Sequence, residues 1–393
     1  MSYNKLIEFE NRFINCCFIT DGRTTFECVN KTSLDYHDRS YSIPKGITIS
    51  DYMKNFDDVC STFKINPLCC LYQLEKLAKK IIHIGLSKQK ECNTQVLDEF
   101  ELKHSLKYNS GFIYANTTIR TSATTTSYDR NSSYAVALKS SVLQWTTKQG
   151  KYIKIDKMPD NLYSTLAYYL VRIDLNSRLP INFRNFKTQD GHLIEWLTNY
   201  EILTLKLYNT VHELVNANDY NCYTYENEKI NYRSMHETNI MKLYKMKMGG
   251  NLVAKNILKM LHGVLFKQFD KEYHERATKA RQIKTGEYIL NKDGDEIEVF
   301  KNKGHEHYLY NHLRNCRFYY AFGRLSMNKD IAEIENAGFN VYRSYFDSIV
   351  CDKNDYMDKR IGDAMGQCKY EAKEWNNTIG IFVNSKSWKQ INE

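Results

Sequence analysis

The sequence predicts an α+β fold that combines antiparallel strands with long helices. Alternating apolar residues mark β-prone runs at 166–175 (LAYYLVRIDL) and 341–350 (VYRSYFDSIV), and apolar residues at helical spacing predict a helix near 66–85. All four prolines precede residue 181, so none interrupts the elements of the second half. A chain of 393 residues with 42% hydrophobic content can bury a substantial core, in two or three parts.

The composition favours a polyanionic partner and an intracellular location. Lys and Arg outnumber Asp and Glu by 55 to 46, and 13% of the residues are aromatic. Cationic side chains neutralise phosphates and rings stack on unpaired bases, although a solvated basic surface explains the charge equally well. The 11 cysteines form no C-x-x-C pattern, and no apolar run approaches 18 residues. We therefore expect a cytoplasmic protein with reduced thiols and no membrane segment.

The stretch 128–138 (YDRNSSYAVAL) ends a β-prone run with Asp129, then Ser132 and Tyr134. An Asp at a strand end can hold a divalent metal while the next turn offers backbone N–H groups to phosphates, which suits nucleotidyl transfer. In isolation, such an Asp more often caps a turn or helix. Upstream, Ser110 and Gly111 would let backbone approach a nucleic acid strand, although a β-turn explains them equally well.

Residues 241–269 predict two helices joined by a tight turn at Gly249–Gly250. On the second helix, Lys255, Lys259, Gly263 and Phe266 share one face, opposite a leucine face. Two lysines beside an aromatic ring could clamp a triphosphate and stack on a base. A solvated lysine face is the alternative.

Three further segments complete the pattern. A helix is expected near 197–215, a β-hairpin at 288–300 with Asp293–Gly294 as its turn, and a helix over 312–331. Asp347 then falls within the apolar alternation of 341–350, where an unpaired carboxylate is costly to bury. A bound metal would explain its presence there.

Together these motifs, in this order, resemble the polymerase domain of family B DNA polymerases, most closely the protein-primed branch of small bacteriophages and linear plasmids. YDRNSSY resembles motif A (D-x-x-S-L-Y-P), which makes Asp129 the first metal-binding carboxylate. KMLHGVLFKQF resembles motif B, with Lys259 in the lysine position, and YFDSIV resembles motif C (D-T-D-S-I), with Asp347 as the second carboxylate. The resemblance covers about residues 108–393.

The flanking motifs match less closely. YNSG resembles the Y-x-G-G motif and KSW the K-x-Y motif. The resemblance implies DNA-binding roles for a set of residues in these motifs and before motif B: Tyr108, Ser110, Gly111, Lys242, Lys247, Lys386 and Trp388. Motif C has Tyr345 in place of its first Asp, and motif B has Gly263 and Phe266 where the family has Asn and Tyr.

The resemblance implies a right-hand polymerase architecture of α+β class, with an antiparallel palm sheet, two-helix fingers and inserted subdomains. The expected parts are an N-terminal α+β cap without exonuclease motifs (1–107), a first palm part with motif A (108–149), an insertion like the region that contacts the priming protein (150–231), fingers with motif B (232–270), a hairpin insertion (271–308), and a second palm part with motif C and the K-x-Y-like motif (309–393). We expect the thumb and the exonuclease to be missing from this chain.

The implied function is DNA-directed DNA synthesis by two-metal phosphoryl transfer, in protein-primed replication of a small viral or plasmid genome. Asp129, Asp347 and the backbone carbonyl of Arg130 would hold two Mg²⁺ ions, with Mn²⁺ as an alternative. Ser132, Tyr134, Lys255, Lys259 and Phe266 would bind the deoxynucleotide, with Tyr134 excluding a 2′-hydroxyl.

The expected partners are a DNA primer-template, dNTPs, a terminal priming protein and separate thumb or exonuclease subunits, in the host cytoplasm if the protein is viral. Two alternatives remain open at this point. One is a template-independent nucleotidyltransferase, and the other is a catalytically idle DNA-binding subunit of a split polymerase.

Overall fold

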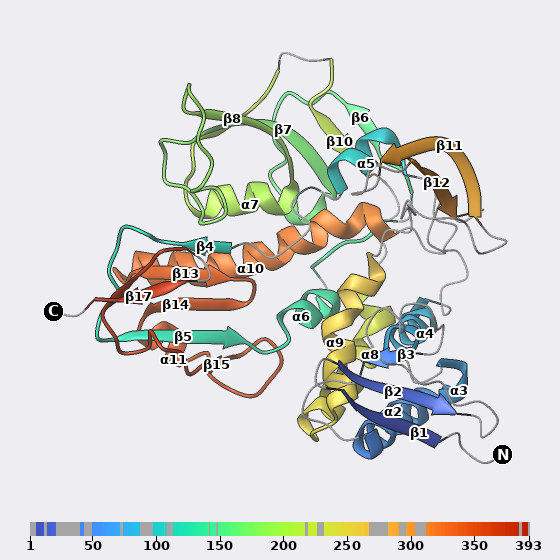
Figure 1. Cartoon of the computed structure of the whole chain (residues 1–393). Coiled ribbons are helices and arrows are strands. Elements are labelled where there is room, and N and C mark those ends of the chain that lie inside the picture. Colours follow the sequence, from blue (N-terminus) through green and yellow to red (C-terminus); the bar gives the residue numbers. More distant parts are fainter. Residues whose placement is uncertain are drawn as a thin grey trace. The chain divides into compact units, whose positions relative to one another are not determined.

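The chain is described here by a computed structural model. It describes residues 5–11, 14–20, 40–42, 49–70, 74–86, 97–105, 107, 113–140, 142–146, 148–216, 219–225, 232–266, 282–290, 296–302, 312–384 and 387–391. Two compact units make up the chain: Met1–Lys90 with Arg233–Leu265, and Glu91–Tyr232 with Phe266–Glu393. Both mix helices with antiparallel strands, as the sequence predicts (Figure 1).

The first unit combines a three-stranded sheet with a group of helices. Its strands are β1 (Lys5–Asn11), β2 (Ile14–Thr20) and β3 (Ser40–Ser42), and its helices are α2 (Ile49–Phe63), α3 (Pro67–Cys70), α4 (Leu74–Leu86), α8 (Tyr232–Met248) and α9 (Leu252–Leu265). Helix α9 packs against α2 and α4. The helix expected over 66–85 is therefore two helices, α3 and α4.

The turn between α8 and α9 confirms the predicted pair of helices. Gly250 has φ +88°, a left-handed conformation that glycine adopts without a Cβ penalty. Asn251 then caps α9, because its Oδ1 accepts the backbone N–H of Ala254 at 2.8 Å. On α9 the buried side chains include Ile257, Leu258 and Leu261, so the apolar face is the one that the leucine spacing predicts.

The second unit is built around a five-stranded antiparallel sheet with the order β15-β5-β14-β13-β4. Its strands are β4 (Ile113–Ala115), β5 (Thr125–Arg130), β13 (Val341–Tyr345), β14 (Ser348–Asp352) and β15 (Cys368–Tyr370). Helix α10 (Cys316–Asn336) covers one face with Met327, Ile331 and Ile334. Trp375 and Phe382 pack on Tyr342 and Val350 in a separate cluster. We call this sheet the β5–β14 sheet.

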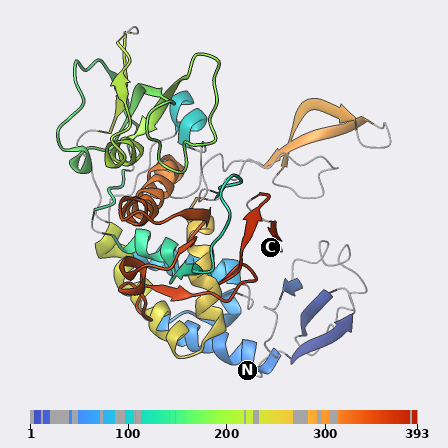
Figure 2. The ribbon, with the colours of Figure 1, turned by 90° about the vertical axis from the view of Figure 1, so that its left-hand side faces the viewer.

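A second sheet of this unit has the order β6-β10-β7-β8, with β9 also paired to β7. Its strands are β6 (Lys151–Ile153), β7 (Ala167–Asp174), β8 (His192–Thr198), β9 (His212–Leu214) and β10 (Cys222–Thr224). Helix α10 contacts α7 (Asn199–Leu207) and β8 on this side and β13 on the other, so it lies between the two sheets (Figures 1 and 2).

The helix expected near 197–215 is shorter than predicted. Thr198 and Glu201 form a capping box that starts α7, and Asn209, with φ +54°, follows its end. His212–Leu214 then forms a strand paired with β7. These hydrogen-bonded contacts stabilise an extended backbone, although the apolar residues are spaced as in a helix. The prediction of one helix over the whole segment is therefore wrong in its second half.

The remaining elements are short or lie in the second half. The second unit also contains short helices and a short strand pair. They are helices α5 (Glu99–Ser105), α6 (Ser133–Lys139) and α11 (Asp355–Asp358), the 3-10 turns η1 (Leu162–Ser164) and η2 (His312–Asn315), and the strand pair β16 (Gly380–Phe382) and β17 (Trp388–Gln390).

The predicted hairpin is formed by strands β11 (Gln282–Leu290) and β12 (Glu296–Asn302), whereas its turn at 293–294 lies outside the described residues. Within the described residues, no helix is both long and apolar enough to span a bilayer.

Candidate active site

The two carboxylates that the sequence singles out lie at the ends of paired strands. Asp129 is the second-last residue of β5, and Asp347 lies in the hairpin turn just before β14. Ser348 pairs with Asp129, and the backbone N–H of Arg130 donates to the carbonyl oxygen of Asp347 at 3.0 Å. The antiparallel register therefore brings Asp129 and Asp347 to neighbouring positions at one end of the β5–β14 sheet.

Both carboxylates lie beside left-handed backbone. Ser132, the N-cap of α6, has φ 53°, and Phe346, in the two-residue turn between β13 and β14, has φ 55°. Non-glycine residues adopt this conformation at a cost of about 1–2 kcal/mol each, and such strain concentrates at functional sites. The geometry of both turns therefore supports a site at this sheet end.

The side chain of Arg130 anchors the end of β5 in the core. It is 4% exposed, forms an ion pair with Asp330 of α10, and donates to Ser326 Oγ at 2.7 Å. Asp330 also accepts from the hydroxyl of Tyr356 at 2.9 Å and pairs with Arg360 at 3.4 Å. The strand that carries Asp129 is thus tied to α10 through charged groups that solvent barely reaches.

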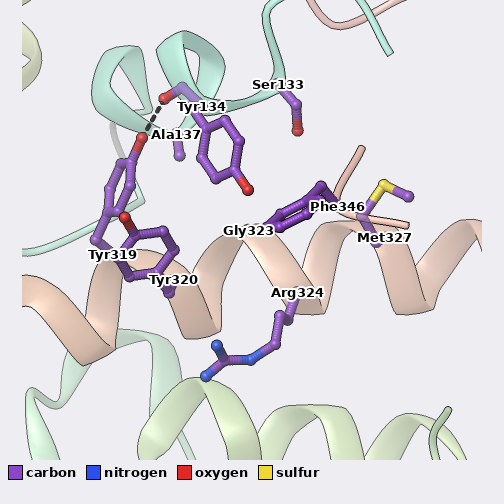
Figure 3. A pocket seen from close by; sticks show the side chains of 9 residues that line it. All are labelled: Ser133, Tyr134, Ala137, Tyr319, Tyr320, Gly323, Arg324, Met327 and Phe346. Atoms are coloured by element: carbon purple, nitrogen blue, oxygen red, sulfur yellow. Dashed lines mark hydrogen bonds between the residues drawn. The ribbon is translucent and has the colours of Figure 1, made fainter. Parts of the chain in front are cut away.

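Tyr134 lies on the first turn of α6, where it faces α10. Its ring lies 6.4 Å from the ring of Tyr319 and 6.1 Å from that of Tyr320, and the Tyr319 hydroxyl donates to the Tyr134 carbonyl oxygen at 2.7 Å. Figure 3 shows the Tyr134 side chain pointing into a pocket of about 20 Å³ that Phe346 also lines. That volume admits about one water molecule, so little open space remains beside the Tyr134 ring.

Phe266, predicted to stack on a base, is 7% exposed. Its ring stacks on Trp145 at 5.9 Å and lies 5.1 Å from Tyr319 and 6.1 Å from Tyr320. The same two tyrosines therefore support both Phe266 and Tyr134. In the structure Phe266 has a packing role, and its contact with a base stays a prediction.

The predicted lysine face exists on the first unit. Lys255 and Lys259 are both exposed on α9, one turn apart and opposite its buried residues. On α8, Lys242 lies over the ring of Phe63 at 5.7 Å and Lys247 over that of Tyr244 at 5.1 Å. Their contacts with a triphosphate or DNA stay predictions.

Trp388, from the K-x-Y-like motif, packs against the cluster of Tyr342, Val350, Trp375 and Phe382. Its ring also lies against Gly380, where an added Cβ would come within 2.4 Å of the indole. Lys386, Tyr108, Ser110 and Gly111 lie outside the described residues.

Lys369 is a site residue that the motif analysis did not select. It pairs across β15 and β5 with Asp129, and its Nζ lies 3.0 Å from Asp129 Oδ2. The hydrogen bond with Asp129 raises the pKa of Lys369, and the charges of Asp129, Glu371 and Asp347 act in the same direction. Both carboxylates, Asp129 and Asp347, therefore favour the charged form of Lys369. The only sequence signal is a charged residue in the short run CKYE.

The donor set at this sheet end suits Mg²⁺. In the part of the chain that the structure describes, no group of three or more His, Cys, Asp or Glu is arranged to hold a metal. Mg²⁺ binds nucleotides through one or two carboxylates plus substrate phosphates, and does not need an all-protein cage. Two carboxylates, Asp129 and Asp347, with the neighbouring backbone carbonyl of Arg130, fit this pattern.

Comparison with solved structures finds proteins with a similar fold. The chain is similar to phi29 DNA polymerase complexed with primer-template DNA in a post-translocation binary complex (TM-score 0.54, 14% identity, 90% of this chain and 62% of that one). It is also similar to phi29 DNA polymerase complexed with single-stranded DNA (0.54, 13%, 81% and 54%) and to its orthorhombic crystal form (0.51, 15%, 81% and 55%).

These similarities show a phi29 DNA polymerase-like fold, as the resemblance to the protein-primed branch predicts. The chain spans between about half and three-fifths of the structures it matches. No family model matches the sequence, and no curated protein matches it.

Proposed function

We propose that this protein is a DNA-directed DNA polymerase that extends a primer end by two-metal phosphoryl transfer. The observation that carries the proposal is the placement of Asp129 and Asp347 at the ends of the paired strands β5 and β14. The phi29 DNA polymerase-like fold agrees with it, and solved structures of that protein include complexes with primer-template DNA and incoming nucleotides.

Asp129 and Asp347 would hold the metal ions, with the backbone carbonyl of Arg130 as a further oxygen donor. When bound, two Mg²⁺ ions would activate the primer hydroxyl and neutralise the triphosphate; Mn²⁺ could replace them. The protein's own contribution is to fix both carboxylates before substrate arrives. Arg130 does so for β5 through its buried ion pair with Asp330, and the backbone bond from Arg130 to Asp347 ties the second carboxylate to the first strand.

The nucleotide would lie over the first turn of α6. Ser132 would hold the turn that presents backbone N–H groups to the phosphates. Tyr134 would pack under the sugar, and because Tyr319 and Tyr320 support its ring, it would yield little to an added 2′-hydroxyl. The exposed pair Lys255 and Lys259 offers two ammonium groups to a triphosphate.

The DNA would be held by residues outside this centre. Lys242 and Lys247 offer positive charge, and Trp388, with Lys386 near it in sequence, would steady the primer end. The first nucleotide would be attached to a terminal priming protein. The genome copied would be that of a small virus or plasmid.

The test is extension of a labelled primer on a template by the purified protein with Mg²⁺ and all four dNTPs. Asp129→Asn and Asp347→Asn should each abolish extension while DNA binding, measured by a gel-shift assay, is kept. Asp160→Asn is the matched control, because that carboxylate is 95% exposed and pairs only loosely with Lys157 at 4.0 Å. Retained extension in either site variant would refute the assignment.

Two other outcomes would identify the alternatives. Extension with a single dNTP and no template, lost in the same two variants, would indicate a template-independent nucleotidyltransferase. DNA binding without extension, with or without a template, would indicate a catalytically idle subunit of a split polymerase.

A further inference from the structure

Lys369 is fixed opposite Asp129 by the backbone around it. The residue lies on β15, paired with Asp129 on β5, and its Nζ is 3.0 Å from Asp129 Oδ2. Cross-strand partners point to the same face of a sheet, so the ammonium and the carboxylate meet without any rearrangement of the strands.

The loop before β15 is also bonded to the turn that follows Asp129. The backbone N–H of Asn131 donates to Gln367 O, and that of Gly366 donates to Asn131 O, both at 2.8 Å. The Asn131 side chain donates to the carbonyl oxygen of Gly362 at 2.9 Å. These bonds hold Lys369 at one distance from the turn, whereas its long side chain can still move.

The ion pair is suited to exchange. The side chain of Lys369 is 54% exposed and that of Asp129 is 21% exposed, so solvent screens the pair and its net stabilisation is small. A divalent cation on Asp129 needs the same oxygen lone pairs and is repelled by the ammonium. Asp347 lies in the turn that is bonded to the end of β5, and Glu371 follows Lys369 by two residues, so the ammonium has other carboxylates in its neighbourhood.

We propose that Lys369 is a positioning residue that competes with the divalent metal for Asp129 and thereby sets the metal affinity of the site. This inference rests on the proposed function, because it requires Asp129 to be a metal ligand. In this role Lys369 holds the carboxylate in place and raises the metal concentration at which the site fills.

The test is direct binding of Mn²⁺, followed by the loss of the free-ion signal in electron paramagnetic resonance. Lys369→Met keeps the length of the side chain and removes its charge. It should bind Mn²⁺ about tenfold more tightly, a change of about 1.4 kcal/mol, because the ammonium that repels the cation and competes for Asp129 is gone. Lys369→Arg keeps the charge and should bind as the unaltered protein does. Lys373→Met is the matched control: Lys373 pairs with Glu371 at 3.2 Å and is 37% exposed.

The outcomes separate the inference from the proposed function. Equal or weaker binding by Lys369→Met, with binding still lost in Asp129→Asn, would overturn the competition and leave the metal site standing. An equal gain in Lys373→Met would overturn it as well, because the effect would then be one of net charge. Binding that ignores Asp129→Asn and Asp347→Asn would overturn both the competition and the metal site.

Discussion

Removing the carboxylate that holds Arg130 should destabilise the second unit strongly. Asp330 is 2% exposed and its partner Arg130 is 4% exposed, so water screens this pair very little. Asp330→Ala leaves a buried guanidinium whose remaining contacts include Ser326 but no carboxylate within the same ion pair, and removing one partner of such a pair costs about 3–5 kcal/mol. The pair with Arg360 adds little, because that side chain is 39% exposed.

The assay is urea unfolding followed by tryptophan fluorescence. The chain has four tryptophans, Trp145, Trp196, Trp375 and Trp388, and all lie in the second unit, so the signal reports the unit that contains the ion pair. A midpoint shift at unchanged slope gives the change in the free energy of unfolding. A loss under about 1 kcal/mol, the usual value for an exposed pair, would refute the reasoning.

A double variant tests whether the loss comes from the unpaired charge. Arg130→Met with Asp330→Leu removes both charges and fills much of the same volume, and replacing a buried pair in this way is often neutral. The double variant should therefore unfold at higher urea than Asp330→Ala alone. A loss in the double variant equal to the sum of the single losses would show instead that the two side chains act independently.

Three further changes test other parts of the structure. Gly263→Ala on α9 should raise the free energy of unfolding by about 0.5–1 kcal/mol in urea, since an added Cβ meets nothing within 4 Å, whereas Gly250→Ala, at φ +88°, should lower it. Burial, and next the charge of Arg317, lower the pKa of His104 from 6.5 to about 4, so its neutral form stabilises the fold and that stability is lost as the pH falls from 6.5 toward 4. Between pH 7.5 and 4.5 the loss of unfolding free energy should be smaller by about 2–3 kcal/mol in His104→Gln than in the unaltered protein. Tyr134→Ala should reduce the preference for dNTPs over rNTPs in primer extension by about 10- to 200-fold, and Tyr134→Phe should not; an unchanged preference in the alanine variant would argue against the sugar gate.

The sequence predicts the strands of the site better than its side-chain contacts. Asp129 ends a β-prone run, so the local pattern places it at a strand end. Asp347 is expected within the run 341–350, but it lies in the turn between β13 and β14, and the antiparallel pairing of β5 with β14 brings the two carboxylates together. Lys369 escapes notice because β15 has only three residues and no alternation. Lys369 faces Asp129 because β15 pairs with β5, and a local sequence pattern does not predict which strands pair.

Phe266 is a second residue whose contacts the local sequence pattern did not predict. Helical spacing places it on the lysine face of the segment, which led to a predicted role in stacking on a base. Its actual neighbours, Tyr319 and Tyr320, lie on α10, and contacts between distant segments decide its burial. Similarly, pairing with β7 turns His212–Leu214 into a strand although the spacing of apolar residues continues the helix.

The left-handed turn at Phe346 joins Asp347, the proposed metal ligand, to the pocket beside Tyr134, the proposed sugar gate. A glycine would remove the strain at φ 55°, yet a bulky aromatic residue occupies the position. Its ring lies 4.7 Å from that of Tyr345 and lines the pocket into which Tyr134 points (Figure 3). The same turn carries Asp347, so a change in the backbone of the turn would displace both the Phe346 ring in the pocket and the carboxylate that follows it. A glycine at 346 would relieve the backbone strain but would remove the ring that lines this pocket.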